Sequence, residues 1–299
     1  MDIKRSTDQP EQLSGFLPLR GFMPYVKFAF LSMLFMILYA PGMISMVYSW
    51  IRSEEYSHGF LIPVISGYLI WTKRAAIRAQ QIETDGRGFF LFLSGIVMLI
   101  IGFVGFEPYI RNVSMLITLA GIIWLFFGRR LLMAVAFPLG YLLFMIPLPY
   151  IFMKSFAVGL RLFDAKVTHT ILSYAGIPIA REGTTLELPN ISLVVADFCT
   201  GVLSIVAISA IAVLYAYLTQ KRMMGRIILV LLAIPIAITG NVFRLITTVV
   251  LAYFFGERVL GSAIHQFHGT INFLFTIALL ILAGRVLSGI DNKMNKAVS

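Results

Sequence analysis

Cysteine and charge are what this sequence has least of. It contains 1 cysteine in 299 residues, which excludes an internal disulfide and gives no information on the redox compartment. Only 13% of the residues are charged and 59% are hydrophobic, whereas about a quarter of a soluble globular domain is charged. Paired cysteines, an HExxH motif, internal repeats and interdomain linkers are also lacking. The composition therefore indicates an integral membrane protein.

Long apolar runs dominate the chain. A membrane-spanning helix needs about 20 apolar residues, and by that rule we count about eight transmembrane helices. The predicted fold class is therefore an all-α polytopic membrane protein. The second run is short and the seventh is long. The runs cover residues 28–49, 58–72, 88–106, 113–128, 131–149, 199–218, 227–254 and 269–284.

The basic residues gather on one side of these runs. With the N-terminus in the cytoplasm, the inner connections hold most of the 24 lysines and arginines, such as Lys73 and Arg130. The positive-inside rule then favours an orientation with both termini in the cytoplasm. The net charge of +10 thus reflects cytoplasmic loops, and we expect no nucleic-acid partner. We expect a cytoplasmic segment at 1–27, a single membrane-embedded domain at 28–288 and a cytoplasmic tail at 289–299.

One long connection, between the fifth and sixth runs, does not span the membrane and lies on its outer side in this orientation. Its first part, 151–174, mixes apolar and charged residues, which predicts a short helix in the membrane interface. Two β-prone runs, 184–188 and 191–195, flank Pro189-Asn190 and predict a β-hairpin. This hairpin leads directly to the only cysteine, Cys199.

Three chemically distinctive residues fall at one depth. At ~1.5 Å per residue, a helix rises about 27 Å from Arg226 to Arg244 and about 28 Å between Leu218 and Cys199. Both distances approach the hydrocarbon thickness of about 30 Å. His265 precedes the last run on the same side. The sequence therefore predicts Cys199, Arg244 and His265 near the outer boundary of the membrane.

Each of these residues also has a purely structural interpretation. Arg244 can extend its charge to the outer headgroups, Cys199 can be a small buried hydrophobe, and His265 can serve only in packing. A cysteine nucleophile requires a thiolate, which a nearby cation favours. A metal site needs three or four ligands, and no such pattern is present, so we expect neither a metal nor a cofactor. Supporting or substrate-binding candidates are Asp197, Thr200, Gly201, Asn241, His268 and His58.

Three short blocks resemble those of the exosortase/archaeosortase family. The family has a cysteine followed by a small hydroxyl residue and glycine, an asparagine-x-x-arginine, and a histidine followed closely by glycine. Here the corresponding blocks are Cys199-Thr-Gly201, Asn241-Val-Phe-Arg244 and His265-Gln-Phe-His-Gly269. The resemblance extends over about residues 48–275. The chain departs from the family at Thr200, where a serine is usual.

The resemblance implies a cysteine transpeptidase or protease of the bacterial inner membrane, with its active site facing the periplasm. Cys199 is then the nucleophile, Arg244 stabilises the thiolate or the oxyanion, and His265 is the general acid and base. The implied partner is an exported protein with a C-terminal sorting signal (PEP-CTERM-like) that includes a transmembrane helix, and the family is associated with surface polysaccharide production. Membrane lipids are the other expected partner, and the oligomeric state stays open. The alternatives are a transporter and a noncatalytic membrane component of polysaccharide assembly.

Overall fold

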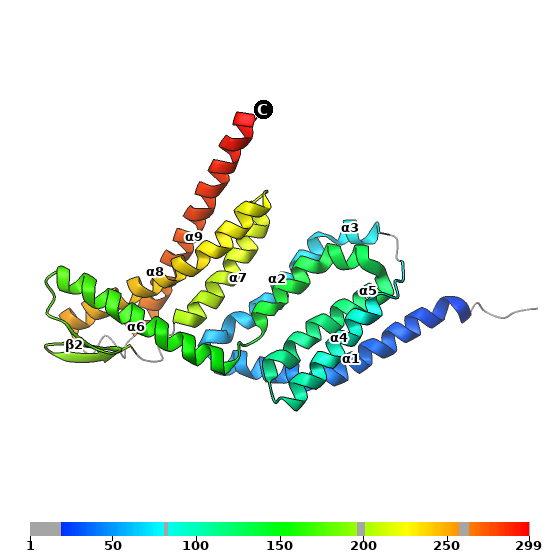
Figure 1. Ribbon diagram of the computed structural model, residues 1–299, viewed down its shortest axis with the longest axis horizontal. Helices are drawn as coiled ribbons and strands as arrows, with labels where there is room; N and C mark the ends of the chain where they lie inside the picture. The colour runs from blue at the N-terminus through cyan, green and yellow to red at the C-terminus, as the bar shows by residue number, and fades with distance from the viewer. Residues whose placement is uncertain (1–18, 81–82, 196–200, 257–262, 299) are drawn as a thin grey trace, which may run out of the picture. The chain divides into compact units, whose positions relative to one another are not determined.

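The computed structural model describes residues 19–80, 83–195, 201–256 and 263–298. Most of these residues are helical, and one small sheet is present, in agreement with the predicted fold class (Figure 1). The elements are α1 (Leu19–Arg52), η1 (Glu54–Phe60), α2 (Leu61–Thr72), α3 (Arg74–Arg78), α4 (Gly88–Val104), α5 (Pro108–Tyr141), η2 (Leu142–Met145), α6 (Tyr150–Tyr174), β1 (Ala180–Glu182), β2 (Thr185–Leu188), β3 (Ile191–Val194), α7 (Gly201–Thr219), α8 (Met223–Phe255) and α9 (Ala263–Val298).

The chain divides into two compact units, Met1–Pro41 and Gly42–Ser299. In the first unit the beginning of α1 is helical, and the rings of Phe35 and Tyr39 lie one turn apart with centroids separated by 4.8 Å. The second unit contains all the other elements. The candidate residues named above therefore all belong to the second unit.

Every predicted apolar run falls mainly on helical structure over its described residues. By length and composition, 4 of the described helices can cross a membrane, and further apolar helices are shorter. The count of about eight spans and the cytoplasmic placement of both termini stay predictions. The long helices are Phe28–Arg52, Pro108–Met145, Met223–Phe255 and Gly269–Ile290, and the shorter ones are Gly88–Val104 and Ile205–Thr219.

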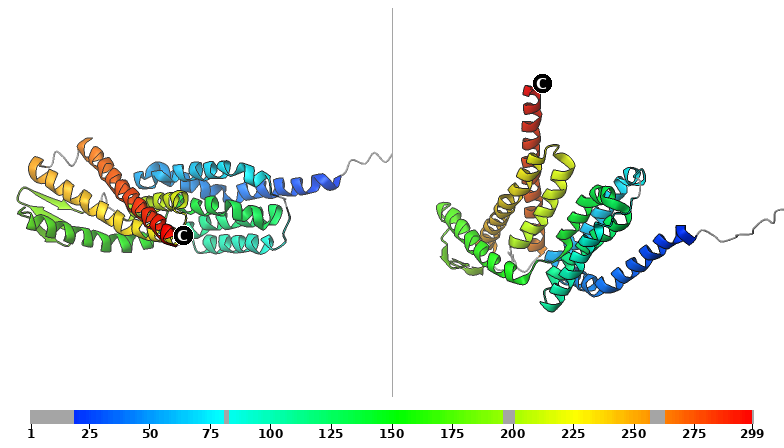
Figure 2. Two further views of the ribbon diagram at one scale, coloured as in Figure 1. Left: turned by 90° about the horizontal axis from the view of Figure 1, so that it is seen from above. Right: turned by 45° about the vertical axis from the view of Figure 1, so that its right-hand side comes forward.

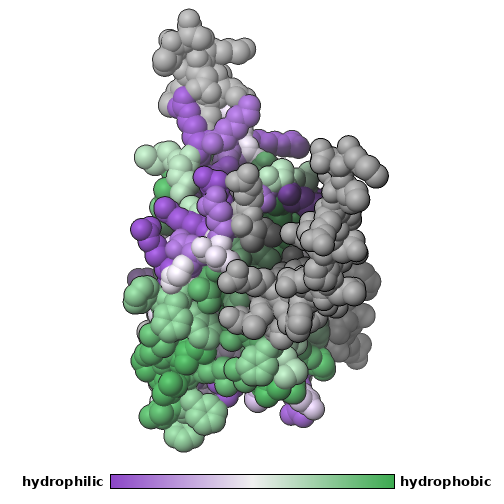
Figure 3. Space-filling view, turned by 90° about the vertical axis from the view of Figure 1, so that its right-hand side faces the viewer, coloured by the Kyte–Doolittle hydropathy of each residue, from purple (hydrophilic) through white to green (hydrophobic). Residues whose placement is uncertain are grey.

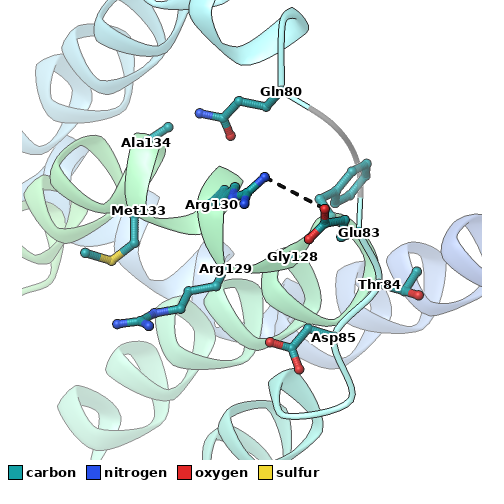
Figure 4. A pocket seen from close by; sticks show the side chains of 10 residues that line it. Gln80, Glu83, Thr84, Asp85, Gly128, Arg129, Arg130, Met133 and Ala134 are labelled. Carbon is teal, nitrogen blue, oxygen red and sulfur yellow. Dashed lines mark ion pairs between the residues drawn. The ribbon is translucent and has the colours of Figure 1, made fainter.

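Gly128 divides α5 into two parts. Its φ of 86° and ψ of 168° are not helical, and glycine adopts such a conformation without a steric penalty. A Cβ here would lie 2.4 Å from the carbonyl oxygen of Glu83. The Glu83 carboxylate lies 3.8 Å from the Arg130 guanidinium, as the dashed line in Figure 4 marks. The break coincides with the predicted boundary between the runs 113–128 and 131–149.

Helices α7, α8 and α9 pack against one another (Figures 1 and 2). Without a hydrophobic driving force between helices in lipid, small residues allow the close approach that dispersion contacts require. At Gly240 of α8, a Cβ would lie 2.0 Å from the Thr276 hydroxyl oxygen of α9. The shared core of the three helices is rich in alanine and contains Ile208, Ala212, Ala216, Leu229, Ala233, Ala237 and Leu280.

The three strands form an antiparallel sheet in the order β1-β2-β3. The predicted hairpin is confirmed, because β2 and β3 pair across Pro189-Asn190 with Thr185 opposite Val194. β1 is an element that the sequence pattern does not predict; it joins β2 through a turn in which Gly183 has a φ of 60°. The buried side of the sheet, including the fully buried Leu186, shares one hydrophobic core with α6 and α8.

Large hydrophobic side chains cover much of the described surface. Phe90, Val104 and Phe106 are 73%, 72% and 91% exposed. Figure 3 shows a continuous hydrophobic area on one face, with hydrophilic residues gathered beyond its border. Soluble monomers rarely expose apolar patches of this kind, so this surface fits contact with lipid.

Candidate active site

A polar stripe runs along α8 inside an otherwise apolar helix. Asn241, Arg244 and Thr248 follow one another at spacings of three and four residues, so they share a face of the helix. Asn241 and Thr248 are buried and Arg244 is partly buried. The Thr248 hydroxyl donates a hydrogen bond of 2.8 Å to the Arg244 carbonyl oxygen. Of the residues expected at the site, Asn241 and Arg244 thus lie in a partly enclosed polar layer.

Helix α6 supplies a carboxylate to this layer. Asp164 is fully buried, and one of its oxygens accepts a hydrogen bond of 2.5 Å from the Asn241 side-chain nitrogen. Asp164 belongs to the buried face of α6, which also includes Ala157, Leu160, Ala165, Thr168 and Leu172. This face packs against α7 and α8. Asp164 and Asn241 therefore connect two helices through polar atoms within an apolar interface.

Sequence analysis does not select Asp164. The helical periodicity of α6 could have indicated it. Asp164 lies on the face of the helix whose other residues are mostly apolar or small. The mixed composition of 151–174 predicts an interfacial helix, but it does not show which charged residue lies on the buried face. In the structure Lys166 is exposed, whereas Asp164 is buried. The side of α6 that includes Asp164 is covered because the helix packs against α7 and α8.

Helix α9 completes the layer with further polar positions. Asn272 and Thr276 are buried, and the Thr276 hydroxyl donates a hydrogen bond of 2.9 Å to the Asn272 carbonyl oxygen. The helix is continuous from Ala263, and helical periodicity assigns positions 265, 268, 272 and 276 to one face. The side chains of His265 and His268 lie outside the described part of the structure. The backbone positions of both histidines are therefore compatible with the expected site.

The expected nucleophile Cys199, with Asp197 and Thr200, lies outside the described residues. Gly201 is the first residue of α7, which packs against both α8 and α9. On the other side of this short segment, Val195 is buried in the same core as Leu245 of α8. Both ends of the segment that contains Cys199 are therefore anchored on elements that contact α8.

His58 lies in the short helix η1 and is half-buried. The position of η1 is fixed by Trp50, whose indole nitrogen donates a hydrogen bond of 2.9 Å to the Met145 carbonyl oxygen. Gly59 lies so close to this indole that a Cβ would come within 2.3 Å of it. η1 packs against α7 and η2. His58 is thus on an element that touches the helix following Cys199.

A cavity of about 860 Å³ lies elsewhere in the second unit, between the segment before α4 and the break in α5 (Figure 4). Its residues include Asp85, whose pKa is held below the usual value by hydrogen bonds from the Arg87 backbone amide and the Trp124 indole. None of its lining residues belongs to α6, α7, α8 or α9. We therefore place the candidate active site at the buried polar layer and not at this cavity.

These features define a multi-pass helical membrane protein with a buried polar layer formed by α6, α8 and α9. The family model described as transmembrane exosortase (Exosortase_EpsH) matches residues 50–282. The chain therefore belongs to the transmembrane exosortase family. No curated protein and no solved structure matches the chain. The matched range includes α6, α7, α8, the first part of α9 and every candidate residue.

Proposed function

We propose that this protein is a membrane cysteine peptidase or transpeptidase that cleaves a C-terminal sorting signal from exported proteins. Family membership supports a membrane transpeptidase role. The observation that carries the proposal is Arg244, held next to the hydrogen-bonded Asn241 inside an apolar helix. A charged residue at such a place is costly and usually functional. We place the reaction on the outer side of the inner membrane and link it to surface polysaccharide production.

The first half of the reaction forms a thioester. The Cys199 thiolate attacks the carbonyl carbon of the scissile peptide bond, and a carbon–sulfur bond forms. Arg244 stabilises the thiolate before the attack and the negative oxygen that develops during it. The carbon–nitrogen bond then breaks, and His265 donates a proton to the leaving amine. The sorting signal leaves with this amine.

The second half releases the product. Water or an amine acceptor attacks the thioester carbonyl, while neutral His265 accepts the proton of the attacking group. The carbon–sulfur bond breaks and the Cys199 thiolate is restored. Hydrolysis and transfer differ only in the acceptor. The proposed supporting or substrate-binding residues are Asp197, Thr200, Gly201, Asn241, His268 and His58.

Alkylation of the only cysteine tests this proposal. A membrane-impermeant maleimide is applied to intact spheroplasts that produce a substrate with a C-terminal sorting signal, and labelling and processing are measured together. We expect labelling of Cys199 to block processing and to slow in Arg244→Ala, because loss of the cation disfavours the thiolate. Retained processing after complete labelling would contradict the cysteine mechanism and favour a transporter.

Alanine variants provide the matching genetic test. Cys199→Ala, Arg244→Ala and His265→Ala are each expected to abolish processing while the protein still accumulates in the membrane. His268→Ala is the matched comparison on the same helix, and it should retain more activity than His265→Ala. Full activity of Cys199→Ala would remove the basis of the mechanism. Stable copurified partners without any processing would instead favour a noncatalytic assembly component.

A further inference from the structure

Asp164 has no role in the reaction described above, yet its burial needs an explanation. It is fully buried, and its second carboxylate oxygen has no hydrogen-bond partner within the described part of the chain. A buried carboxylate is costly unless it is paired. An apolar side chain would avoid this cost, as Leu160 and Ala165 do on the same face of α6. Asp164 therefore lowers stability relative to its neighbours, which is typical of a residue retained for function.

Among the described residues, the hydrogen bond of this carboxylate identifies the residue on which it acts. Its bound oxygen accepts from the side-chain nitrogen of Asn241, which lies one helical turn before Arg244. An ionised carboxylate can only accept hydrogen bonds, whereas a side-chain amide has one donor end and one acceptor end. Asp164 therefore determines the orientation of the amide: the nitrogen must face α6, and the oxygen is directed away from Asp164 as an acceptor.

We propose that Asp164 is a positioning residue for the active site and acts through Asn241. By holding the amide nitrogen on α6, it keeps the amide oxygen available to an N–H donor of the polar layer formed with Arg244 and α9. This inference rests on the proposed function, because the layer has a catalytic role only if Cys199, Arg244 and His265 perform the acyl transfer. Such indirect support of catalytic groups is a general requirement for precise active-site geometry.

The titration of Asp164 gives this arrangement a pH dependence. Burial raises the pKa of Asp164 from 3.8 to about 6, and the hydrogen bond from Asn241 opposes this rise. Above about pH 6 the carboxylate is ionised and the amide is oriented. Below that pH the protonated carboxyl can also donate, so the amide can turn. The helix α6 packs against α7, α8, β1 and β2. The other charged or titratable side chains described on these five elements are Lys154, Arg161, Lys166, His169, Tyr174, Arg181, Glu182, Glu187, Tyr215, Tyr217, Arg226, Arg244 and Tyr253.

The sign of the stability effect separates positioning from folding. Because folding raises the pKa of Asp164, the folded state favours the protonated form. The stability that Asp164 contributes is therefore fully present below its ordinary pKa of 3.8 and is lost as the pH rises through about 6. At pH 7.5 the carboxylate is a net cost to the fold. Asp164→Asn should thus keep or raise thermal stability at pH 7.5, while a residue needed only for folding would lower it.

Processing by the full-length protein in membranes tests the proposal. For Asp164→Asn we expect kcat to fall roughly 10- to 100-fold with little change in KM, because the reacting groups are misplaced but the substrate still binds. The decrease of activity below pH 6 should become weaker in this variant. Thr168→Val is the matched control, since Thr168 is fully buried one turn away on the same helix. We expect this control to keep the wild-type kcat and pH profile.

Exchange of the two residues provides the decisive variant. Asn241→Asp alone places two carboxylates together and should be inactive. The double variant Asp164→Asn with Asn241→Asp restores one carboxylate and one amide, and it still leaves a free acceptor oxygen on α8. We expect its kcat to be roughly 3-fold or more above that of either single variant, because the functional pair is restored.

Three results would overturn the proposal. The first is a wild-type kcat and pH profile in Asp164→Asn. The second is loss of activity in this variant together with lower thermal stability at pH 7.5 and no recovery in the exchange variant. The third is failure of both variants to accumulate, which assigns Asp164 to folding. Cys199→Ala is measured in parallel: if it still processes substrate, the cysteine mechanism itself fails, whatever Asp164 does.

Discussion

Asn241 and Arg244 illustrate what a polar residue means inside an apolar helix. In lipid, an unsatisfied polar group costs several kcal/mol, so its partners must lie within the protein. Asn241 has such a partner in Asp164, which lies on another helix and is 77 residues away in the sequence. The asparagine and the arginine could be selected from the sequence, because their neighbours are almost all apolar. Asp164, the partner of Asn241, could not, because its own helix is of mixed composition.

Gly240, next to Asn241, controls how closely α8 and α9 approach each other. Gly240→Ala would place a Cβ 2.0 Å from the Thr276 hydroxyl oxygen. This hydroxyl cannot move away freely, because it donates a hydrogen bond to the Asn272 carbonyl oxygen. We expect a loss of about 1–3 kcal/mol of stability and a reduced rate of processing. Thermal unfolding in detergent and the processing assay measure the two effects.

Gly289→Ala is the control for this prediction. Gly289 also lies in α9, but nothing is within 4 Å of a Cβ built there. Alanine is favoured over glycine in a helix by about 1 kcal/mol, so this variant should be neutral or slightly more stable. Equal stability of the two variants would show that the helices separate at Gly240 without cost.

At the scale of elements, the β-sheet holds α6 and α8 together. One hydrophobic core joins the three elements. It contains Ala165 and Leu172 of α6, Leu186 and Ile191 of the sheet, and Val249 of α8. The hairpin was predictable because two β-prone runs flank a Pro-Asn turn. β1 was not, since its three residues are all exposed and show no alternation of apolar and polar side chains. Short edge strands are defined by the pairing partner more than by their own sequence.

Leu186→Ala tests this role of the sheet. The side chain is fully buried, and truncation of a buried leucine to alanine costs about 2–5 kcal/mol. We expect a clearly lower unfolding temperature and faster proteolysis of the chain between β3 and α7. Val194→Ala is the control, because Val194 is 61% exposed and should change stability by no more than about 0.5 kcal/mol. An unaltered unfolding temperature in Leu186→Ala would mean that the sheet does not support the helices.

At the scale of the whole molecule, the orientation in the membrane determines where the chemistry takes place. The charge distribution predicts that the β-sheet lies outside and that the loop before α4 lies inside. The break of α5 at Gly128 fits this prediction, because it separates two runs where a single long helix would otherwise place the later elements on the wrong side. Arg129 and Arg130 follow the break directly, and the carboxylates of Glu83 and Asp85 line the same cavity (Figure 4).

Cysteine accessibility tests the orientation. In the Cys199→Ala background, Ser192→Cys on β3 and Thr84→Cys in the loop before α4 each introduce a single thiol at an exposed position. An impermeant maleimide should label Ser192→Cys in intact spheroplasts and Thr84→Cys only after lysis. Labelling of both variants from the same side would contradict the eight-span arrangement.

The sequence by itself determined the membrane class, the helical runs, the hairpin and the residues of the three family blocks. Each of these depends on local composition, or on spacing within one helix or strand. The tertiary structure decided that Asp164 is buried against Asn241, that Gly240 touches Thr276 and that β1 joins the sheet. These features depend on which helix faces and strand edges meet. Periodicity shows that a face is apolar, but it does not show which segment covers it.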